Sequence, residues 1–439
     1  MSRAFLSSVV DALRISCGDP ALASAVTRQA RDLSTFSHQE WMRRLGMLDR
    51  TGLTLPLYAR ISANGEWVHL PFATIQALEK RRRDNTRRME GMLLTFGRAV
   101  CALQEAHVPF VCVKGFSLFP EFHEEPWQRH QIDFDLLIAP RDGPRAQTAL
   151  ERLGYKLTAV AGDGERRLRI PVTQALAHDA YVYQPQQGGF IELHTRFWEA
   201  GKEEFRLSCP DDAFEQAEMH TLGSISFPCL SLPHAFIYQV LHVFRHFLGS
   251  WARPLWLYEI ANFINRHRDD DALWQQVNGL LLEDARVAEA AALVLLTTDE
   301  LFGCSIPLAI SRSCTLPADS PIRLWIRHYA RRWILTDMPG NKLNLLLQRQ
   351  FFSDSRIWRQ YLADRLVPRR ARPVLCEGIE HRVAKGYQYR FANLRFQAAR
   401  VWHHVHTGAG FAAASIAWGM HLRSGQDASP VNELGRSNS

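Results

Sequence analysis

The sequence predicts an α+β protein in which a strand-forming segment lies between helical regions. Two observations support this prediction. Residues 1–106 carry apolar positions at spacings of three and four, the period of amphipathic helices, and residues 230–310 also indicate a helical block. Between them, short apolar runs of β-forming residues at 110–113 and 133–138 are typical of buried strands.

The chain has 439 residues, 46% of them hydrophobic, so it is long enough to bury a substantial core. Its formal net charge of +7 comes from an excess of Arg and Lys that is prominent in the C-terminal third. This excess is compatible with an anionic partner such as a nucleotide or nucleic acid, but a solvated basic face is the commoner explanation.

The eight cysteines are scattered without a Cys-x-x-Cys pair, which favours reduced thiols over disulfides. The N-terminus has no signal-peptide pattern, because Asp11 and Arg14 interrupt the only apolar opening. No run reaches the roughly 18 apolar residues that a membrane helix needs. We therefore expect a cytoplasmic protein without a membrane partner.

The last helix before the strand segment is long, with one apolar stripe from Met89 to Leu103. A basic run over Lys80–Arg83 and Arg87–Arg88 precedes the stripe. Two interpretations of this run stay open. A solvated helix face is the more common one, and a contact with phosphate or RNA is the alternative.

A possible phosphate loop follows the first strand, at Lys114 and Gly115. The glycine leads through a short turn containing Ser117 into a segment that we expect to be helical from Leu118. Exposed backbone N–H groups and a helix N-terminus favour phosphate oxygens. Strand–glycine–helix junctions are common, so this signal gains weight only from the acidic strand that follows.

Asp133 and Asp135 lie one residue apart at the start of the second strand. Because strand side chains alternate, both carboxylates project from one face, about 7 Å apart at Cα. Two neighbouring anions repel unless a cation neutralises them, and carboxylate oxygens suit Mg²⁺, which also bridges nucleotide phosphates. The pair predicts a site for divalent metal.

A third carboxylate, Glu192, lies on a later predicted strand over 190–194 and shares its face with His194. Further strands are expected at 156–160 and 180–183, after a short helix that ends at Gly154. Three carboxylates on two strands are typical of nucleotidyl transfer. The third one either holds the metal that activates the attacking hydroxyl or takes its proton.

His242 and His246, four residues apart on a predicted helix, share a face and have two interpretations. They could bind a metal, but no acidic third ligand is nearby, so a structural or substrate-contacting role is favoured. Arg245 and Arg253 could reach a triphosphate or an acceptor. The aromatic residues Trp251, Trp256 and Tyr258 are more often core than base-stacking surface.

Several segments together resemble the uncharacterised nucleotidyltransferase family of the DNA polymerase beta-like superfamily, over roughly residues 25–310. These are Val-Lys-Gly-Phe-Ser-Leu, an Arg shortly before Asp-Phe-Asp-Leu-Leu-Ile, Leu-Gly-Tyr after the next helix, and Ile-Glu-Leu-His-Thr-Arg-Phe. The resemblance implies a small mixed β-sheet with flanking helices and metal-dependent transfer of a nucleoside monophosphate from an NTP.

Carried over by position, the resemblance implies a nucleotide site and a metal site. Gly115 and Ser117 would bind the triphosphate, with Lys114 and Arg129 near its charge. The catalytic and metal-holding residues would be Asp133, Asp135 and Glu192, with two Mg²⁺ ions. The candidate substrate contacts are His194, His242, Arg245 and His246.

We therefore expect a Mg²⁺-dependent nucleotidyltransferase that uses an NTP, most simply ATP, and an acceptor hydroxyl on a small molecule, peptide, protein or RNA. Two alternatives remain: a degenerate member that binds nucleotide without catalysis, and a nucleic-acid-binding protein with a structural acidic strand. The expected regions are a helical N-terminal region 1–106, a nucleotidyltransferase core 107–228, a helical region 229–310 packing on it, a basic helical region 311–423, and a disordered tail 424–439.

Overall fold

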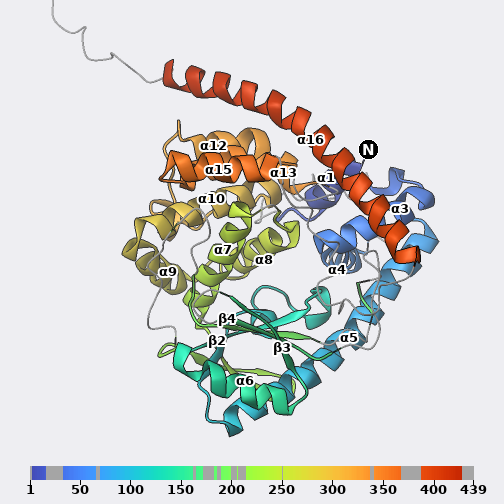
Figure 1. Ribbon diagram of the computed structural model, residues 1–439, viewed down its shortest axis with the longest axis vertical. Coiled ribbons are helices and arrows are strands. Elements are labelled where there is room, and N and C mark those ends of the chain that lie inside the picture. The colour runs from blue at the N-terminus through green and yellow to red at the C-terminus, as the bar shows by residue number, and fades with distance from the viewer. Residues whose placement is uncertain are drawn as a thin grey trace, which may run out of the picture.

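A mixed β-sheet has helices on both of its faces, with the larger helical body on one side (Figure 1). This arrangement confirms the predicted α+β class, with helical regions before and after the sheet. The computed structural model describes residues 2–15, 33–65, 70–161, 165–171, 182–184, 189–198, 205, 214–249, 251–336, 341–366 and 387–427.

The sheet has seven strands in the order β3-β4-β5-β2-β1-β7-β6. It is mixed, because β1 runs parallel to β7 and β2 runs parallel to β5, whereas the other neighbours are antiparallel. The strands are β1 (Phe110–Cys112), β2 (Asp133–Ile138), β3 (Lys156–Ala161), β4 (Glu165–Arg169), β5 (Phe190–His194), β6 (Glu218–Leu222) and β7 (Ile225–Cys229).

Four of the predicted strands are present, as β1, β2, β3 and β5. The strand expected at 180–183 is wrong where the structure describes it, because Val182 and Tyr183 lie in a turn; residues 180 and 181 lie outside the described residues. The helix expected from Leu118 is also wrong. A short 3₁₀ turn, Gly115–Leu118, begins at the glycine itself and is followed by a further turn, in which the Phe122 N–H donates to the carbonyl of Leu118 at 2.9 Å.

Alternation along β2 divides its side chains between two environments. Phe134, Leu136 and Ile138 pack into a core that also contains Phe96 and Leu150. These two residues come from α5 (Phe72–Glu105) and α6 (Gly143–Arg152). The opposite face, which carries Asp133 and Asp135, is therefore turned towards the helical body on the other side of the sheet (Figure 1).

The N-terminal helices follow the predicted periodicity. In α5 the stripe from Met89 to Leu103 is buried, as the spacing predicts. The basic run lies on the same helix, and most of it is solvated or paired at the surface; Arg83, for example, has a side chain that is 59% exposed. Arg88 differs, because it is 1% exposed. The preceding helices are α1 (Ser2–Ala12), α3 (His38–Thr51) and α4 (Thr54–Asn64).

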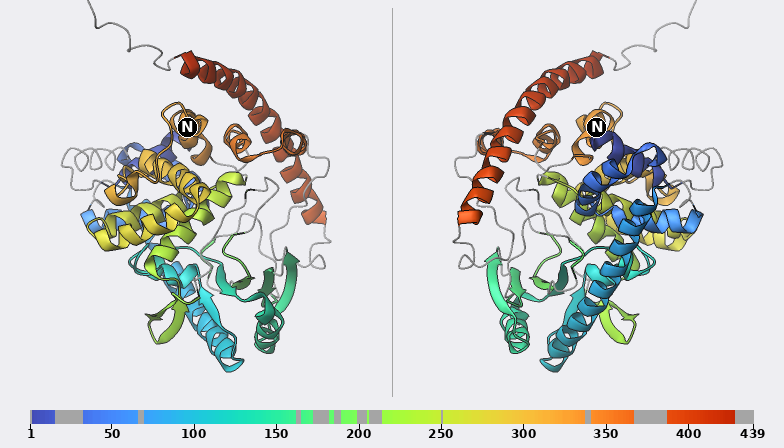
Figure 2. Two further views of the ribbon diagram at one scale, coloured as in Figure 1. Left: turned by 90° about the vertical axis from the view of Figure 1, so that its left-hand side faces the viewer. Right: turned by 90° about the vertical axis from the view of Figure 1, so that its right-hand side faces the viewer.

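The helical body that covers the acidic face consists of four helices in sequence, α7 (Leu232–Leu248), α8 (Pro254–Arg266), α9 (Asp271–Glu283) and α10 (Ala285–Phe302). Shorter helices and a long outer helix, α16 (Tyr387–Asp427), follow, and Figure 2 shows α16 along the outside of the molecule. The short helices are α11 (Leu308–Ser311), α12 (Pro321–Trp325), a π turn (Ile326–Ala330), α13 (Arg331–Ile334), α14 (Asn344–Gln348) and α15 (Ser355–Leu366).

Other sequence-based expectations have partial outcomes. Among the described cysteines, Cys101, Cys112, Cys229, Cys304 and Cys314 are free thiols, as predicted. The expected disordered tail began too early, because residues 424–427 belong to α16; its remainder lies outside the described residues. None of the helices that the structure describes is long and apolar enough to span a bilayer.

Candidate active site

The parallel pairing of β2 with β5 places two of the predicted carboxylates side by side. Asp135 is the direct Cα partner of Glu192, and Asp133 precedes it by two residues on the same face. Because the other face of both strands is filled by apolar side chains such as Ile191 and Leu193, a register slip of one residue would bury the acids in that core. The hydrophobic pattern thus fixes the positions of the acids.

His194 completes a cluster of potential metal ligands with these acids. One donor atom each from Asp135, Glu192 and His194 lies within 4.8 Å of the others. His194 Nε2 lies 3.0 Å from Asp135 Oδ1 and 4.0 Å from Glu192 Oε2. Two carboxylate oxygens and an imidazole nitrogen suit a divalent ion, so this set fits a metal. Asp133 shares the face but lies outside this group, and its predicted metal role stays a prediction.

Each of the two paired acids also contacts a cation. Lys114 Nζ lies 3.3 Å from Asp135 Oδ2, and Arg167 Nη2 lies 2.7 Å from Glu192 Oε1. Burial acts to raise the pKa of Asp135, but Lys114 and His194 outweigh it and hold that pKa well below its ordinary value. Burial acts to lower the pKa of Lys114, but the charges of Asp135 and Asp133 outweigh it and raise that pKa above its ordinary value. The ammonium therefore stays charged.

Glu192 has the opposite electrostatic situation. Burial and, to a smaller extent, the charges of Asp135 and Asp133 raise its pKa to about 7. The charge of Arg167 offsets only part of this increase. The pKa of His194 is raised as well: burial acts to lower it, but the hydrogen bond and charge of Asp135 prevail. One acid is thus firmly ionised, and its neighbour exchanges a proton near neutrality.

Two residues of this site were not predicted from the sequence. Glu165 Oε1 lies 3.8 Å from His194 Nδ1, and Arg167 holds Glu192. Both come from β4, whose sequence Glu-Arg-Arg-Leu-Arg has a single apolar residue and lacks the β-branched alternation by which strands are recognised.

The predicted phosphate loop lies directly beside the acidic strand. Gly115 has φ of +82°, and a Cβ at this position would lie 3.5 Å from the main-chain oxygen of Asp133. The thiol of Cys112 donates a hydrogen bond to the carbonyl of Lys114 at 3.2 Å. The loop therefore joins β1 to the start of β2 in one compact unit.

Residues 37–303 match the model of a family described as an uncharacterised nucleotidyltransferase. The chain belongs to this family. No curated protein matches the chain. Membership makes the acidic face of β2 and β5 the candidate active site of a nucleotidyltransferase, and the cluster of Asp135, Glu192 and His194 could bind the metal that such chemistry uses.

A substitution at Gly115 tests whether this loop binds nucleotide. Replacing it with Ala puts a Cβ on left-handed backbone and should cost about 1–2 kcal/mol of unfolding free energy, measured by chemical denaturation. Gly65 has φ of +68°, and a Cβ added there would meet no atom within 4 Å, so Gly65→Ala is a matched control. We expect both variants to lose similar stability and only Gly115→Ala to weaken nucleotide binding. Equal nucleotide binding by the two variants would contradict a role of the loop.

Arg129 is held by a buried acid that sequence reasoning missed. Its Nε donates to Glu259 Oε1 at 2.7 Å, and His123 Nε2 lies 3.2 Å from the same oxygen. Burial acts to raise the pKa of Glu259, but Arg129 and His123 lower it to about 2. Arg129 also donates from Nη1 to Gln131 Oε1 at 3.2 Å. The ion pair with Glu259 therefore compensates part of its charge, and the amide of Gln131 orients it.

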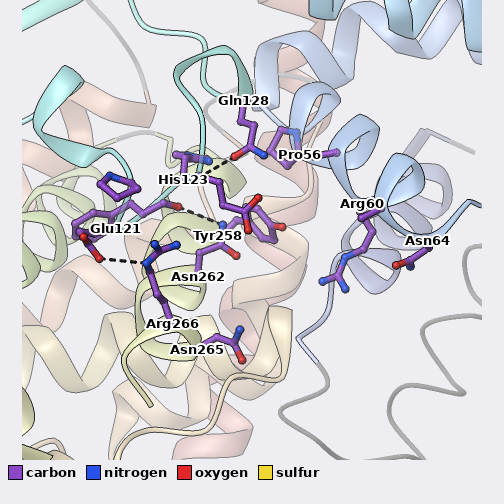
Figure 3. A pocket seen from close by; sticks show the side chains of 15 residues that line it. Pro56, Arg60, Asn64, Glu121, His123, Gln128, Tyr258, Asn262, Asn265 and Arg266 are labelled. Carbon is purple, nitrogen blue, oxygen red and sulfur yellow. Dashed lines mark hydrogen bonds and ion pairs between the residues drawn. The ribbon is translucent and has the colours of Figure 1, made fainter. Parts of the chain in front are cut away.

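A polar hollow of about 350 Å³ lies next to this network, between α4, the 120–128 loop and α8 (Figure 3). His123 lines it, and α8 contributes Tyr258, Asn262 and Arg266. Asn262 donates to the carbonyl of Phe122 at 3.2 Å. None of the three clustered metal-ligand candidates lines this hollow, so it is separate from the acidic site.

The α7 histidines form an aromatic group rather than a metal site. The ring centroids of His242 and His246 are 4.7 Å apart, and His246 lies 4.0 Å from Trp256. Burial holds the pKa of His242 well below its ordinary value and lowers that of His246 to about 3, and the Lys114 charge adds to both shifts. Both rings are therefore neutral near the acidic site. Arg245, on the same helix, is exposed and lies over Trp198 at 6.0 Å.

Proposed function

We propose that this protein transfers a nucleoside monophosphate from an NTP, most simply ATP, to an acceptor hydroxyl in the presence of Mg²⁺. The observation that supports the proposal best is the register of β2 and β5, which aligns Asp135 with Glu192 and leaves Asp133 on the same face. Carboxylates that converge in this way, in a nucleotidyltransferase family, suit the binding of two divalent ions.

We assign Asp133, Asp135 and Glu192 to the metal ions, with His194 as an additional ligand of the cluster. Bound Mg²⁺ would neutralise charge on the phosphates and lower the pKa of the acceptor hydroxyl. If Glu192 does not itself hold a metal ion, its pKa of about 7 suits acceptance of the hydroxyl proton instead. The acceptor oxygen forms a bond to the α-phosphorus, the bond from that phosphorus to the bridging oxygen breaks, and pyrophosphate leaves.

Nucleotide binding is assigned to the loop and its cations. The backbone of Gly115 and the side chains of Lys114, Ser117 and Arg129 would contact the triphosphate. His194, His242, Arg245 and His246 are proposed as contacts to nucleotide or acceptor. The neutral rings of His242 and His246 suit hydrogen bonding or stacking rather than charge pairing.

The proposal is tested by incubating the full chain with each NTP, labelled at the α-phosphate, together with Mg²⁺ and a lysate of the source cell. We expect a labelled acceptor with wild-type protein and none with Asp133→Ala. A parallel reaction with γ-labelled NTP should leave the acceptor unlabelled, because pyrophosphate carries that label away. Transfer of the γ-label, or labelling that survives Asp133→Ala, would reject nucleotidyl transfer by this site.

A second candidate function is nucleotide binding without transfer. The ion pairs of Lys114 with Asp135 and of Arg167 with Glu192 favour it, because they neutralise the acids without any metal. Under this alternative, NTP binding measured by calorimetry is unchanged by EDTA and by Glu192→Gln. Under nucleotidyl transfer, EDTA weakens NTP binding.

A further inference from the structure

Two arginines beside the acidic site lack an acidic partner. Arg88 on α5 is 1% exposed, and Arg253, which is half-buried, immediately precedes α8. In the described part of the chain, neither guanidinium has a carboxylate within 4.0 Å. The Nε atoms of both are buried and make no hydrogen bond.

The few contacts of these two side chains leave most of their donors unused. Arg88 donates to the carbonyl of Gln131 and, from Nη1, to the sulfur of Met89 at 4.0 Å. Arg253 lies 5.5 Å from the ring centroids of Trp251 and Trp256. A guanidinium has five N–H donors, so both groups keep unused capacity for an anion.

For Arg88, which is almost completely buried, this arrangement costs free energy unless something compensates it. Buried charges in proteins are normally paired, and the effective desolvation penalty is several kcal/mol per ion. Burial lowers the pKa of Arg88 only to about 10, so its side chain remains charged at neutral pH. Lys114 and Arg129, which we assign to the same triphosphate, each have an acidic partner in the protein, Asp135 and Glu259 respectively, so their charges are partly compensated without a ligand.

Hydrogen bonds connect the surroundings of the two guanidiniums. Arg88 donates to the carbonyl of Gln131, and the Gln131 side chain accepts from Arg129. Arg129 in turn pairs with Glu259 on α8, the helix that Arg253 precedes. The charge of Asp133 stabilises the charged form of both arginines. His130 responds to both as well: burial lowers its pKa most, followed by the charges of Arg88 and Arg253. Arg88 on α5 and Arg253 at the start of α8 therefore approach Asp133 from two different elements.

We propose that Arg88 and Arg253 together bind the β- and γ-phosphates of the NTP, and the pyrophosphate that leaves. The identity of the anion rests on the proposed function; the anion site rests on the two unpaired arginines. A polyphosphate presents several oxygens to two planar donor groups and supplies the negative charge that the protein itself does not provide. Arg88 is then the member of the basic run on α5 that contacts phosphate.

The test is binding of inorganic pyrophosphate to the full-length protein in Mg²⁺ buffer, measured by calorimetry without NTP or acceptor. We expect Arg253→Gln and Arg88→Gln each to weaken binding about tenfold or more, since hydrogen bonds to charged groups are worth about 1.5–3 kcal/mol. Arg83→Gln, on the exposed part of the same basic run, should bind like the wild type. Arg253→Lys should fall between wild type and Arg253→Gln, because it keeps the charge but loses the planar fork.

Stability separates this role from a structural one. Removal of an arginine that stabilises the fold should lower the melting temperature of the ligand-free protein. Removal of an arginine whose charge is unpaired should leave that melting temperature unchanged or raise it. If Arg88→Gln does not fold, Arg88→Lys and the Arg253 variants still decide the outcome. Unchanged pyrophosphate affinity in folded Arg253→Gln, or a lower melting temperature with unchanged affinity, overturns the proposal.

Competition identifies the source of the anion. ATP should displace pyrophosphate from the wild type, because both would occupy the same arginines. Simultaneous binding of ATP and pyrophosphate would assign the arginines to another phosphorylated molecule and overturn the proposal. If Arg253→Gln weakens pyrophosphate binding while no NTP is ever transferred, the proposed activity fails and the anion site stands. If transfer proceeds normally in Arg253→Gln, only the anion site fails.

Discussion

Asp135→Asn is expected to reduce nucleotidyl transfer about a thousandfold or more. This acid is 3% exposed, contacts Lys114 and His194, and is the β2 partner of Glu192, so its loss removes the central carboxylate of the metal-ligand cluster. Stabilisation of transition-state charge by a metal is worth several kcal/mol, and each 1.36 kcal/mol is a factor of ten in rate. The measurement is transfer of α-labelled nucleotide to the acceptor found with the wild type.

The same substitution should also destabilise the protein by about 3 kcal/mol, because it leaves Lys114 charged, buried and unpaired. Adding Lys114→Met to Asp135→Asn should recover much of that stability, as measured in urea, without recovering transfer. Asp142→Asn is a control, since Asp142 is another buried acid that pairs with a cation, Arg145, and it lies outside the metal-ligand cluster. Transfer by Asp135→Asn at the wild-type rate would remove this acid from the mechanism.

The central strands were predictable because their side-chain pattern has a single consistent solution. In β2 every second residue, such as Phe134 and Leu136, is apolar and buried, which forces the intervening acids to the other face. The same rule applies to Ile191 and Leu193 around Glu192. Local alternation therefore predicted which face the acids share, and only the pairing of β2 with β5 was needed to bring them together.

Contacts between distant segments were not predictable in this way. Glu259 lies 130 residues from Arg129 in the chain, and on α8 it occupies a helix whose buried positions are otherwise mostly apolar. Its sequence context gives no signal that it is a fully buried acid, because only tertiary packing brings Arg129 and His123 to it. Arg88 is similar: in the sequence it ends a basic run, but in the fold it is buried and donates to the carbonyl of Gln131, two residues before the central strand β2.

The prediction for the segment after Gly115 failed because tertiary packing overrode the local helix propensity. The turn after Gly115 was expected to lead into a helix from Leu118, but it is a 3₁₀ turn that ends there. Buried Phe116 and Phe119 pack in the core beneath the sheet, and this tertiary packing, rather than helix propensity, determines the path of the chain. His194 was predicted only as a substrate contact, because its distance from Asp135 depends on the pairing of two strands.

The metal-free protein should lose stability as the pH rises from about 4.5 to about 7, and Glu192 should be a principal cause. Burial and the charges of Asp135 and Asp133 raise the pKa of Glu192 from 4.5 to about 7. Between these values the folded protein binds the proton more tightly than the unfolded chain, so the free energy of unfolding falls with increasing pH. The shift corresponds to about 3 kcal/mol, since one pKa unit is 1.36 kcal/mol.

Glu192→Gln should therefore be more stable than the wild type above pH 7 and similar to it near pH 4.5, as measured by urea unfolding in EDTA. Glu151→Gln, at an exposed α6 position, should retain the wild-type pH dependence. Mg²⁺ should reverse the trend, because metal binding requires the deprotonated carboxylate and releases its proton. The stabilisation by a fixed Mg²⁺ concentration should thus be larger at pH 8 than at pH 6 in the wild type, and this difference should shrink in Glu192→Gln. Identical pH profiles for Glu192→Gln and the wild type would show that Glu192 titrates as an ordinary surface acid and would remove it from the metal site.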